Sequence, residues 1–235
     1  MVTSYRSPWM FERYHYRVVD LLKTKFLASP YSTTQFCSRD MLPLPNKTKE
    51  NYKVFLYRLN NPDLDLFTFV DAVKTFFMLA DTRLTEDDDI PAGEIPVFDA
   101  GNVSLKFVGK LNLSVLRKYM LYTQEAIPIR LKQVHIINAP SYIGKIHGVC
   151  KPFLKTEVAK LIKFHEPNST TLYEYVPREL LPDEYGGKAG PLDQIKRQWI
   201  KKIEAKRYKY TYTTERKRCG IFSGIRRISI SVFKI

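Results

Sequence analysis

The stretch of residues 124–187, QEAIPIRLKQVHIINAPSYIGKIHGVCKPFLKTEVAKLIKFHEPNSTTLYEYVPRELLPDEYGG, decides the fold of this chain. Its apolar run at residues 134–137 stops at an Asn-Ala-Pro turn and is typical of a buried strand. Residues 141–162 then place apolar side chains three or four positions apart, which on a helix form one apolar stripe. Pro152 interrupts this stripe, so the pattern predicts two short amphipathic helices.

Four motifs follow one another in this stretch: Pro128-x-Arg130-Leu131-Lys132, His135-Ile136-Ile137-Asn138-x-Pro140, Lys151-Pro152-Phe153-Leu154 and Leu181-Pro182-x-Glu184-Tyr185-Gly186-Gly187. Their order and spacing closely resemble the CRAL-TRIO lipid-binding family, and the resemblance extends over about residues 52–208. It implies an α/β fold in which a mostly parallel sheet, flanked by helices, encloses an apolar cavity. In the family the segment that matches residues 140–161 is a helical lid that opens at a membrane.

Outside this stretch the periodicity alternates between strand and helix. It predicts strands at residues 52–59, 94–99, 134–138 and 171–175, and helices at residues 67–84 and 113–124. The first of these strands is apolar on both faces, which is typical of a central strand covered on both sides. Strands that alternate with helices and long crossovers independently indicate a mostly parallel sheet.

The chain is expected to divide into four parts. Residues 1–46 are a reduced helical N-terminal region, with a helix near residues 18–26, and a linker at 41–46 whose prolines disfavour helix. Residues 47–190 are the CRAL-TRIO domain, and residues 191–208 are a docking helix with an apolar stripe. Residues 209–235 are a basic tail without periodicity, for which the two alternatives are a disordered segment and a divergent splice product. The family places a three-helix domain before the lipid-binding domain; only its end is recognisable here, so this region is expected to be either shortened or diverged beyond recognition.

Charge is distributed unevenly along the chain. Residues 196–235 hold 13 Lys or Arg and two acids, whereas residues 1–195 hold 25 Lys or Arg and 22 acids. The net charge of +14 therefore comes mainly from the C-terminal end. Such a segment is attracted to anionic surfaces, either phospholipid headgroups or nucleic acid.

Composition favours a globular protein in a reducing compartment. The chain is 44% apolar and 13% aromatic, which argues against disorder as its default state. Its cysteines (Cys37, Cys150 and Cys219) are odd in number, widely separated and without metal-site spacing, so a disulfide framework is not expected. The first 17 residues do not resemble a signal peptide, and no segment has the ~18 uninterrupted apolar residues of a membrane span. We expect a cytoplasmic monomer that associates transiently with membranes.

Candidate catalytic groups are sparse. A nucleophile would have to be a serine or a cysteine such as Cys150, paired in space with a histidine such as His135. A histidine in an apolar strand is more often a core group, and no Gly-x-Ser-x-Gly elbow occurs. Phosphate-binding glycine motifs are absent, and His15, His135, His147 and His165 lack zinc-ligand spacing. The sequence therefore predicts a binding protein without enzymatic activity, metal or cofactor.

A ligand pocket is expected on the basis of the resemblance. The apolar faces of three helical segments and a strand could, from the residues alone, form either a solid core or the walls of a cavity. The family encloses a cavity for one apolar molecule here, and its lining falls on Val73, Phe76, Phe77, Ala80, Phe98, Tyr119, Tyr122, Ile127, Ile129, Leu131, Ile143 and Ile146. Serines that orient the ligand in a tocopherol-binding member align with Phe76 and Ala80, so the polar end of the ligand must be recognised differently here.

Cations next to the lid indicate contact with anionic lipid. Arg130 and Lys132 flank Leu131 in extended chain and therefore point the same way, and they match a family pair that contacts phosphoinositide headgroups. A second family pair falls on Glu157 and Leu161 and is absent. Lys155, Lys160 and Lys163 are close enough in sequence to replace it in part.

Three functions remain open at this point. The first is a carrier that binds a tocopherol-, retinoid- or other lipid-like molecule, docks on anionic membranes and transfers its cargo. The second is an adaptor that senses such a lipid without transferring it. The third is a nucleic-acid binder acting through the basic tail, which is disfavoured because the body is nearly neutral and the tail has few aromatic residues for stacking on bases.

Overall fold

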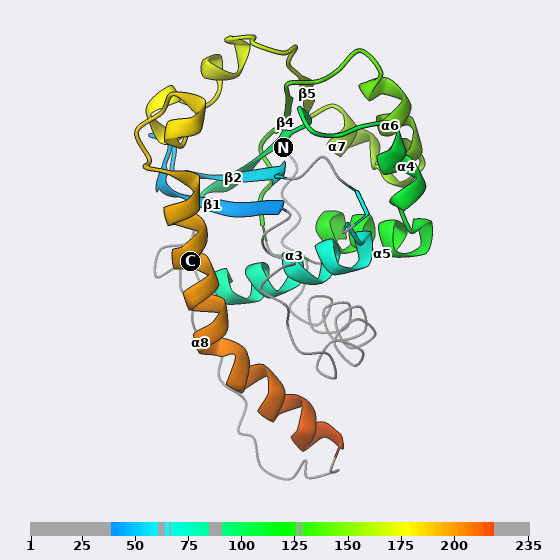
Figure 1. Cartoon of the computed structure of the whole chain (residues 1–235), viewed down its shortest axis with the longest axis vertical. Helices are drawn as coiled ribbons and strands as arrows, with labels where there is room; N and C mark the ends of the chain where they lie inside the picture. The colour runs from blue at the N-terminus through cyan, green and yellow to red at the C-terminus, as the bar shows by residue number, and fades with distance from the viewer. Residues whose placement is uncertain are drawn as a thin grey trace.

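The computed structural model describes residues 39–60, 64–65, 67–84, 91–125, 127 and 129–218. These residues form a five-stranded sheet whose strands lie side by side in chain order (Figure 1). The first pair of strands is antiparallel and the other three pairs are parallel, which confirms the predicted α/β class and mostly parallel sheet. The strands are β1 (Arg39–Lys47), β2 (Tyr52–Leu59), β3 (Gly93–Asp99), β4 (Val134–Ile137) and β5 (Ile162–Phe164).

Different elements cover the two faces of the sheet. Crossovers between parallel strands are right-handed, so strands that neighbour in chain order carry their connecting helices on one side. These helices are α3 (Phe69–Leu84), α4 (Lys106–Lys110), α5 (Leu113–Glu125), α6 (Ile143–Cys150) and α7 (Thr156–Ala159). The opposite face is covered by α8 (Leu192–Arg218) and the short 3-10 helices η2 (Thr171–Glu174), η3 (Arg178–Leu180) and η4 (Asp183–Tyr185).

Strand β1 replaces the linker expected at residues 41–46. That expectation is wrong because proline is accepted in an edge strand or at a bulge, where its missing N–H leaves no ladder hydrogen bond unmade. Pro43 pairs with Phe55 of β2, and the register shifts between Pro43 and Lys47. Leu42 and Leu44 are fully buried, so the apolar side chains between the prolines hold this strand on the sheet.

One further prediction fails near the end of the sheet, and one strand was not predicted. Residues 171–175 are not a strand, because residues 171–174 form the 3-10 helix η2. The strand at this edge is β5, whose Ile162 pairs with Val134 of β4. Three residues are too few to show an alternating pattern, and Ile162 also fits the helical stripe that precedes it. Tertiary pairing with β4 therefore decides its conformation.

Pro152 divides the lid segment, residues 140–161, as predicted. Helix α6 ends at Cys150, and Pro152 lies in the first turn of the 3-10 helix η1 (Lys151–Phe153). Proline fits that position because the N–H groups of a first helical turn have no intrahelical partner. Leu154 is extended, and α7 follows, so the lid consists of short helices joined by a proline turn.

The Leu-Pro-x-Glu-Tyr-Gly-Gly motif attaches the chain after β5 to the sheet. The Tyr185 hydroxyl donates a 2.6 Å hydrogen bond to the Asp99 carboxylate at the end of β3. Glu184 accepts hydrogen bonds from the Leu192 N–H at the start of α8. Gly186 has φ of 67°, a backbone conformation that glycine adopts without strain. The motif therefore positions α8 relative to the sheet.

Helix α8 buries the predicted docking stripe. Trp199 and Ile203 are among its buried residues, and the Trp199 indole N–H donates a 3.2 Å hydrogen bond to the Pro43 carbonyl of β1. The backbone of α8 continues to Arg218, so residues 209–218 are helical and not disordered. Residues 219–235, and the helix predicted near residues 18–26, lie outside the described part of the chain. Within the described part, no helix is both long and apolar enough to cross a membrane.

Candidate functional site

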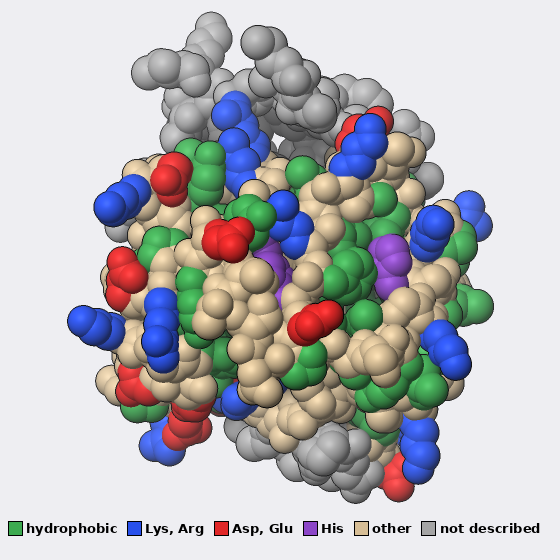
Figure 2. Space-filling view, turned by 90° about the horizontal axis from the view of Figure 1, so that it is seen from above, with side chains coloured by type: hydrophobic (Ala, Val, Ile, Leu, Met, Phe, Trp, Pro, Cys, Tyr) green, Lys and Arg blue, Asp and Glu red, His purple; other side chains and the backbone are tan. Residues whose placement is uncertain are grey.

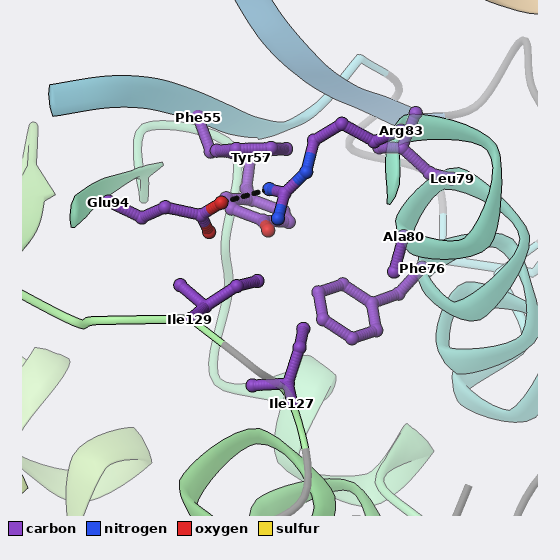
Figure 3. A pocket seen from close by; sticks show the side chains of 9 residues that line it. All are labelled: Phe55, Tyr57, Phe76, Leu79, Ala80, Arg83, Glu94, Ile127 and Ile129. Atoms are coloured by element: carbon purple, nitrogen blue, oxygen red, sulfur yellow. Dashed lines mark ion pairs between the residues drawn. The ribbon is translucent and has the colours of Figure 1, made fainter. Parts of the chain in front are cut away.

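A small cavity lies between the sheet and helix α3, on the side where the connecting helices pack (Figure 3). Its volume is about 20 Å³, and a water molecule needs roughly 10–15 Å³ of such space. The cavity in this structure therefore has room for about one water molecule. It is lined by Phe55, Tyr57, Phe76, Leu79, Ala80, Arg83, Glu94, Ile127 and Ile129.

Aromatic rings occupy most of the space around this cavity. The centroids of Phe76 and Tyr119 lie 5.0 Å apart and those of Phe77 and Tyr122 lie 4.6 Å apart, both pairs in edge-to-face geometry. Tyr57 is stacked on Phe98 with centroids 4.6 Å apart. The question that the sequence left open, solid core or cavity, therefore has an intermediate answer: closely packed rings beside a small void.

The predicted pocket residues are only partly brought together. Phe76, Ala80, Ile127 and Ile129 line the cavity. Val73, Phe77, Tyr119 and Tyr122 belong to the same apolar cluster behind that lining. Phe98 is stacked on Tyr57, which packs against the cluster, Leu131 forms a bridge beside β3, and Ile143 and Ile146 lie on the lid helix α6. The full set of twelve remains a prediction.

Sequence reasoning missed two charged residues of the lining. Arg83, in the last turn of α3, and Glu94, near the start of β3, form an ion pair. Their side chains are only 5% and 8% exposed, and the Arg83 guanidinium lies 4.6 Å from the centroid of the Phe55 ring. An acidic residue in an apolar strand, and a basic residue one turn after Ala80 on the same helical face, are the signals that identify them.

The ion pair gives the cavity a polar end. Burial raises the pKa of the Tyr57 hydroxyl well above its usual value, and nearby Tyr119 and Glu94 add to this effect. Tyr57 therefore keeps its proton and can donate a hydrogen bond. The combination of apolar walls with a few polar groups is the usual composition of a site for a small apolar ligand.

The segment with the predicted cations is attached to the start of β3. The Glu94 N–H donates to the Arg130 carbonyl over 2.8 Å, and the Lys132 N–H donates to the Glu94 carbonyl over 2.9 Å. A side chain on Gly93 would collide with Lys132, so glycine permits this close approach. Arg130 is exposed, and the Lys132 ammonium lies 4.9 Å from the centroid of the Tyr52 ring.

Two of the other predicted cations already have intramolecular contacts. Lys155 forms a 2.7 Å ion pair with Glu125. Lys163 donates to the Tyr175 hydroxyl over 3.1 Å and lies over the same ring. Lys160 is exposed. A phosphate group would have to compete with these contacts at Lys155 and Lys163, so their role in headgroup binding remains a prediction.

Two side chains connect the lid segment to helix α5 and to the loop before α4. The Gln124 amide of α5 donates to the Phe153 carbonyl over 2.9 Å and accepts from the Lys155 N–H over 2.7 Å. The Tyr142 hydroxyl, just before α6, donates to the Val103 carbonyl over 2.9 Å. These contacts hold the lid segment in the position seen here.

His135 and Cys150, the residues considered as a catalytic pair, are both in environments that do not favour catalysis. His135 hydrogen-bonds to His165 through one ring nitrogen, over 2.9 Å, and to Gln133 through the other. Burial, with help from His165 and Lys163, lowers the pKa of His135 to about 4. Burial also raises the pKa of the Cys150 thiol, which favours its unreactive protonated form. The structure therefore does not assemble a Cys150–His135 pair.

Comparisons with known proteins agree with this geometry. The model of the CRAL/TRIO domain matches residues 38–187, which is more than half of the chain. Clavesin-1 of Xenopus laevis is 32% identical over 151 residues, covering 64% of this chain and 45% of clavesin-1. Clavesin-2 of Homo sapiens is 29% identical over 150 residues, covering 64% of this chain and 46% of clavesin-2.

The chain thus spans about half the length of these curated relatives. In fold it is similar to the crystal structure of Sfh5, with a TM-score of 0.55 and 17% sequence identity over 77% of this chain and 67% of that one. The domain match, the mostly parallel sheet and the divided lid segment all point to one family. The chain belongs to the CRAL-TRIO lipid-binding family.

Proposed function

We propose that this protein binds one apolar molecule between the sheet and helices α3 and α5, and exchanges it at an anionic membrane surface. The observation that carries the proposal is the cavity, where lining residues from β2, α3 and the segment before β4 converge. Membership of the CRAL-TRIO family supports a lipid-like guest. The whole activity is proposed here for a chain that covers about half of its relatives.

The site must expand to admit such a guest. Rings from α3 and α5, including Phe76 and Tyr119, now occupy the space beside the cavity. A guest replaces contacts between rings by contacts with itself, so the expanded site is filled and dispersion contacts are not lost. Each buried CH₂ group contributes about 0.8 kcal/mol, so ten such groups contribute about 8 kcal/mol toward the cost of moving the side chains.

The lid contacts allow movement at a modest cost. The bonds from Gln124 to the backbone near Pro152 and from Tyr142 to Val103 are part-buried hydrogen bonds to backbone atoms. Each contributes a net of about 0.5–1.5 kcal/mol. Water near a membrane can replace them, so lid opening and ligand exchange are compatible with a stably folded sheet.

Apolar and basic side chains are exposed together near α4 and α5. Leu105 and Leu113 are 44% and 55% exposed, and α4 between them has no buried residues. Lys106 and Arg117 are exposed within the same part of the chain. Exposed leucines among cations suit insertion into the headgroup region of an anionic bilayer.

Attraction to the membrane is proposed to be general, with the phosphoinositide contact of Arg130 and Lys132 as an addition. Figure 2 shows that, on the face seen from above, Lys and Arg side chains are spread around the rim and are separated by acidic and apolar side chains. Scattered cations attract an anionic surface by about 1 kcal/mol each. Scattered cations are less selective for one type of lipid headgroup than a clustered binding site is.

Extraction of the purified protein with organic solvent, followed by mass spectrometry, tests the binding proposal. We expect one apolar molecule to co-purify, and retinoid, sterol or tocopherol analogues to be shielded from water when added. A protein that carries no lipid and shields none of these analogues would not be a lipid carrier. Transfer between vesicles separates the carrier from the lipid-sensing adaptor, since an adaptor binds lipid without moving it.

Vesicle sedimentation tests the docking proposal. We expect Leu105→Ser combined with Leu113→Ser to weaken binding to anionic vesicles several-fold while ligand binding in solution is unchanged. Phe164→Ser is the matched control, because Phe164 is also an exposed large apolar residue (45%) but lies on β5. If both variants weaken vesicle binding equally, the proposed role of the α4 and α5 region in docking is contradicted.

A further inference from the structure

We propose that the Arg83–Glu94 ion pair is the polar end of the ligand site and selects a neutral molecule with a hydroxyl group over an anionic fatty acid. This inference rests on the proposed function and specifies the chemical class of its ligand. It concerns a buried pair of charges that the family resemblance did not indicate. The two residues come from different elements, α3 and β3, and meet at the cavity (Figure 3).

The placement of the pair is that of a headgroup site. Six of the lining side chains are apolar: Phe55, Phe76, Leu79, Ala80, Ile127 and Ile129. An elongated guest therefore has apolar walls along its length and meets charge only where Arg83 and Glu94 approach each other, next to Tyr57. One orientation is favoured, with the polar group of the guest toward the pair.

The ion pair supplies the polar groups that the neighbouring lining residues of α3 lack. Phe76 and Ala80 line the cavity without a polar group. Arg83 follows Ala80 by three residues and so lies on the same side of α3. A polar headgroup therefore meets this side of α3 at Arg83, one helical turn after Ala80.

A hydroxyl group complements this pair. It donates one hydrogen bond and accepts others, so it can donate to the Glu94 carboxylate and accept from the Arg83 guanidinium. Hydrogen bonds to ionised partners are stronger than those between neutral groups. An alcohol therefore brings little charge into the site and finds partners for both its donor and its acceptor.

A carboxylate is discriminated against by the same arrangement. Arg83 is already paired with Glu94, so an incoming anion must compete with the Glu94 carboxylate for the Arg83 guanidinium and stands close to that carboxylate. Burial of an ion beside a like charge is strongly unfavourable. A cationic headgroup is disfavoured in the same way by Arg83.

The stability of the fold alone does not explain why this ion pair is buried in the cavity lining. A buried ion pair can often be replaced by apolar side chains of similar volume without loss of stability. Here the charges are placed in the lining of the cavity, and the Arg83 guanidinium is also held over the Phe55 ring. Preorganised charges of this kind recognise a ligand without first rearranging.

Binding of two matched pairs of fluorescent probes tests the inference: retinol with retinoic acid, and parinaryl alcohol with parinaric acid. Within each pair the hydrocarbon is the same and only the headgroup differs. The full chain is titrated at pH 8, where a carboxyl group with a pKa near 4–5 is ionised in water. We expect the alcohol of a pair to bind at least tenfold more tightly than its acid.

Variants of the pair assign this preference. Glu94→Gln removes the carboxylate that is paired with Arg83, so acid binding should strengthen and the alcohol-to-acid ratio should fall about tenfold or invert. The double variant Arg83→Met with Glu94→Met removes both hydrogen-bond partners of the hydroxyl group, so the affinity for the alcohol, and with it the alcohol-to-acid ratio, should fall about tenfold. It keeps the inference testable if the single variant does not fold. Glu179→Gln, at an exposed site on η3, is the control and should behave like wild type.

Each outcome decides a specific claim. Equal affinity of the wild type for alcohol and acid, or an unchanged ratio in both cavity variants, overturns the inference while the lipid-binding function stands. Failure of the wild type to bind every probe overturns the proposed function, and the inference with it.

Discussion

The two faces of the sheet bury their side chains in different ways. On the α8 side, Leu42, Leu44 and Leu56 are at most 1% exposed and belong to one core with Trp199 and Ile203. On the α3 side, aromatic rings surround a small cavity that ends at a buried ion pair. Aliphatic side chains fill the first face closely, whereas the second face keeps a small void beside its rings. The comparison indicates that the α8 side contributes mainly to stability, and we place the proposed ligand site on the α3 side.

The largest effect is expected on the α8 side. Trp199→Ala removes a buried indole and its hydrogen bond to Pro43, so the free energy of unfolding should fall by about 3–5 kcal/mol. Urea denaturation followed by circular dichroism measures this loss. Ligand affinity measured in the absence of urea should be unchanged, and a parallel loss of affinity would show that the two faces are not independent.

Acid should also lower the free energy of unfolding through the α8 side, because His135 and His165 pack beside Tyr175 in this layer. Burial lowers the pKa of both histidines, that of His135 to about 4, while the unfolded chain binds protons near pH 6.5. Stability should therefore be complete above about pH 6.5 and decrease as the pH falls toward 4. The decrease should be on the order of 2–3 kcal/mol.

Thermal unfolding at a series of pH values measures this dependence. His135→Asn is the matched variant, because it retains hydrogen-bonding capacity but does not titrate in this range. Its stability should change less between pH 6.5 and 4 than that of the wild type. A slope equal to that of the wild type would assign the acid sensitivity to other groups.

A smaller and more selective effect is expected on the α3 side. Phe76→Leu replaces a lining ring by a smaller side chain and enlarges the cavity, which should lower the free energy of unfolding by about 1–2 kcal/mol. Added ligand should recover most of this loss, since a guest fills the new space. Thermal shifts with and without a bound retinoid measure the recovery. If Phe76→Leu lowers the free energy of unfolding by this amount and added ligand does not restore it, Phe76 is a structural residue only.

The smallest effect on stability is expected at the lid. Gln124→Met removes two part-buried hydrogen bonds to the backbone around η1, and at about 0.5 kcal/mol each, the low end of the usual range, the cost is about 1 kcal/mol. We expect ligand exchange, measured by stopped-flow dilution of a fluorescent probe, to become about threefold to tenfold faster. Gln198→Met, at an exposed position of α8, should leave exchange unchanged. Equal exchange rates in the two variants would mean that Gln124 does not hold the lid.

Long periodic elements were predictable and short or edge elements were not. Helices α3 and α5 and strands β2 and β3 show sustained periods in their apolar residues, and the structure confirms them. Strand β1 contains two prolines and was interpreted as a linker, because tolerance of proline depends on an edge position that sequence does not reveal. Strand β5 has three residues, which is too short for any pattern.

The cavity lining shows the same limit. Phe76 and Ala80 on the long helix α3 were predicted as lining residues from the family resemblance, and both line the cavity. Glu94 was missed because it was read as the first residue of a strand and not as a partner of Arg83, eleven positions earlier in the chain. An ion pair between two elements exists only after both have packed.

The order of motifs in residues 124–187, with the apolar periods around them, was sufficient to identify the family and the α/β class, because local patterns of side chains specify helices, strands and their sequence. The size of the cavity, the closed position of the aromatic rings and the meeting of Arg83 with Glu94 were decided by tertiary packing. The physical reason is that volume and charge contacts depend on distances between elements, and these distances are set by the whole core rather than by any one segment.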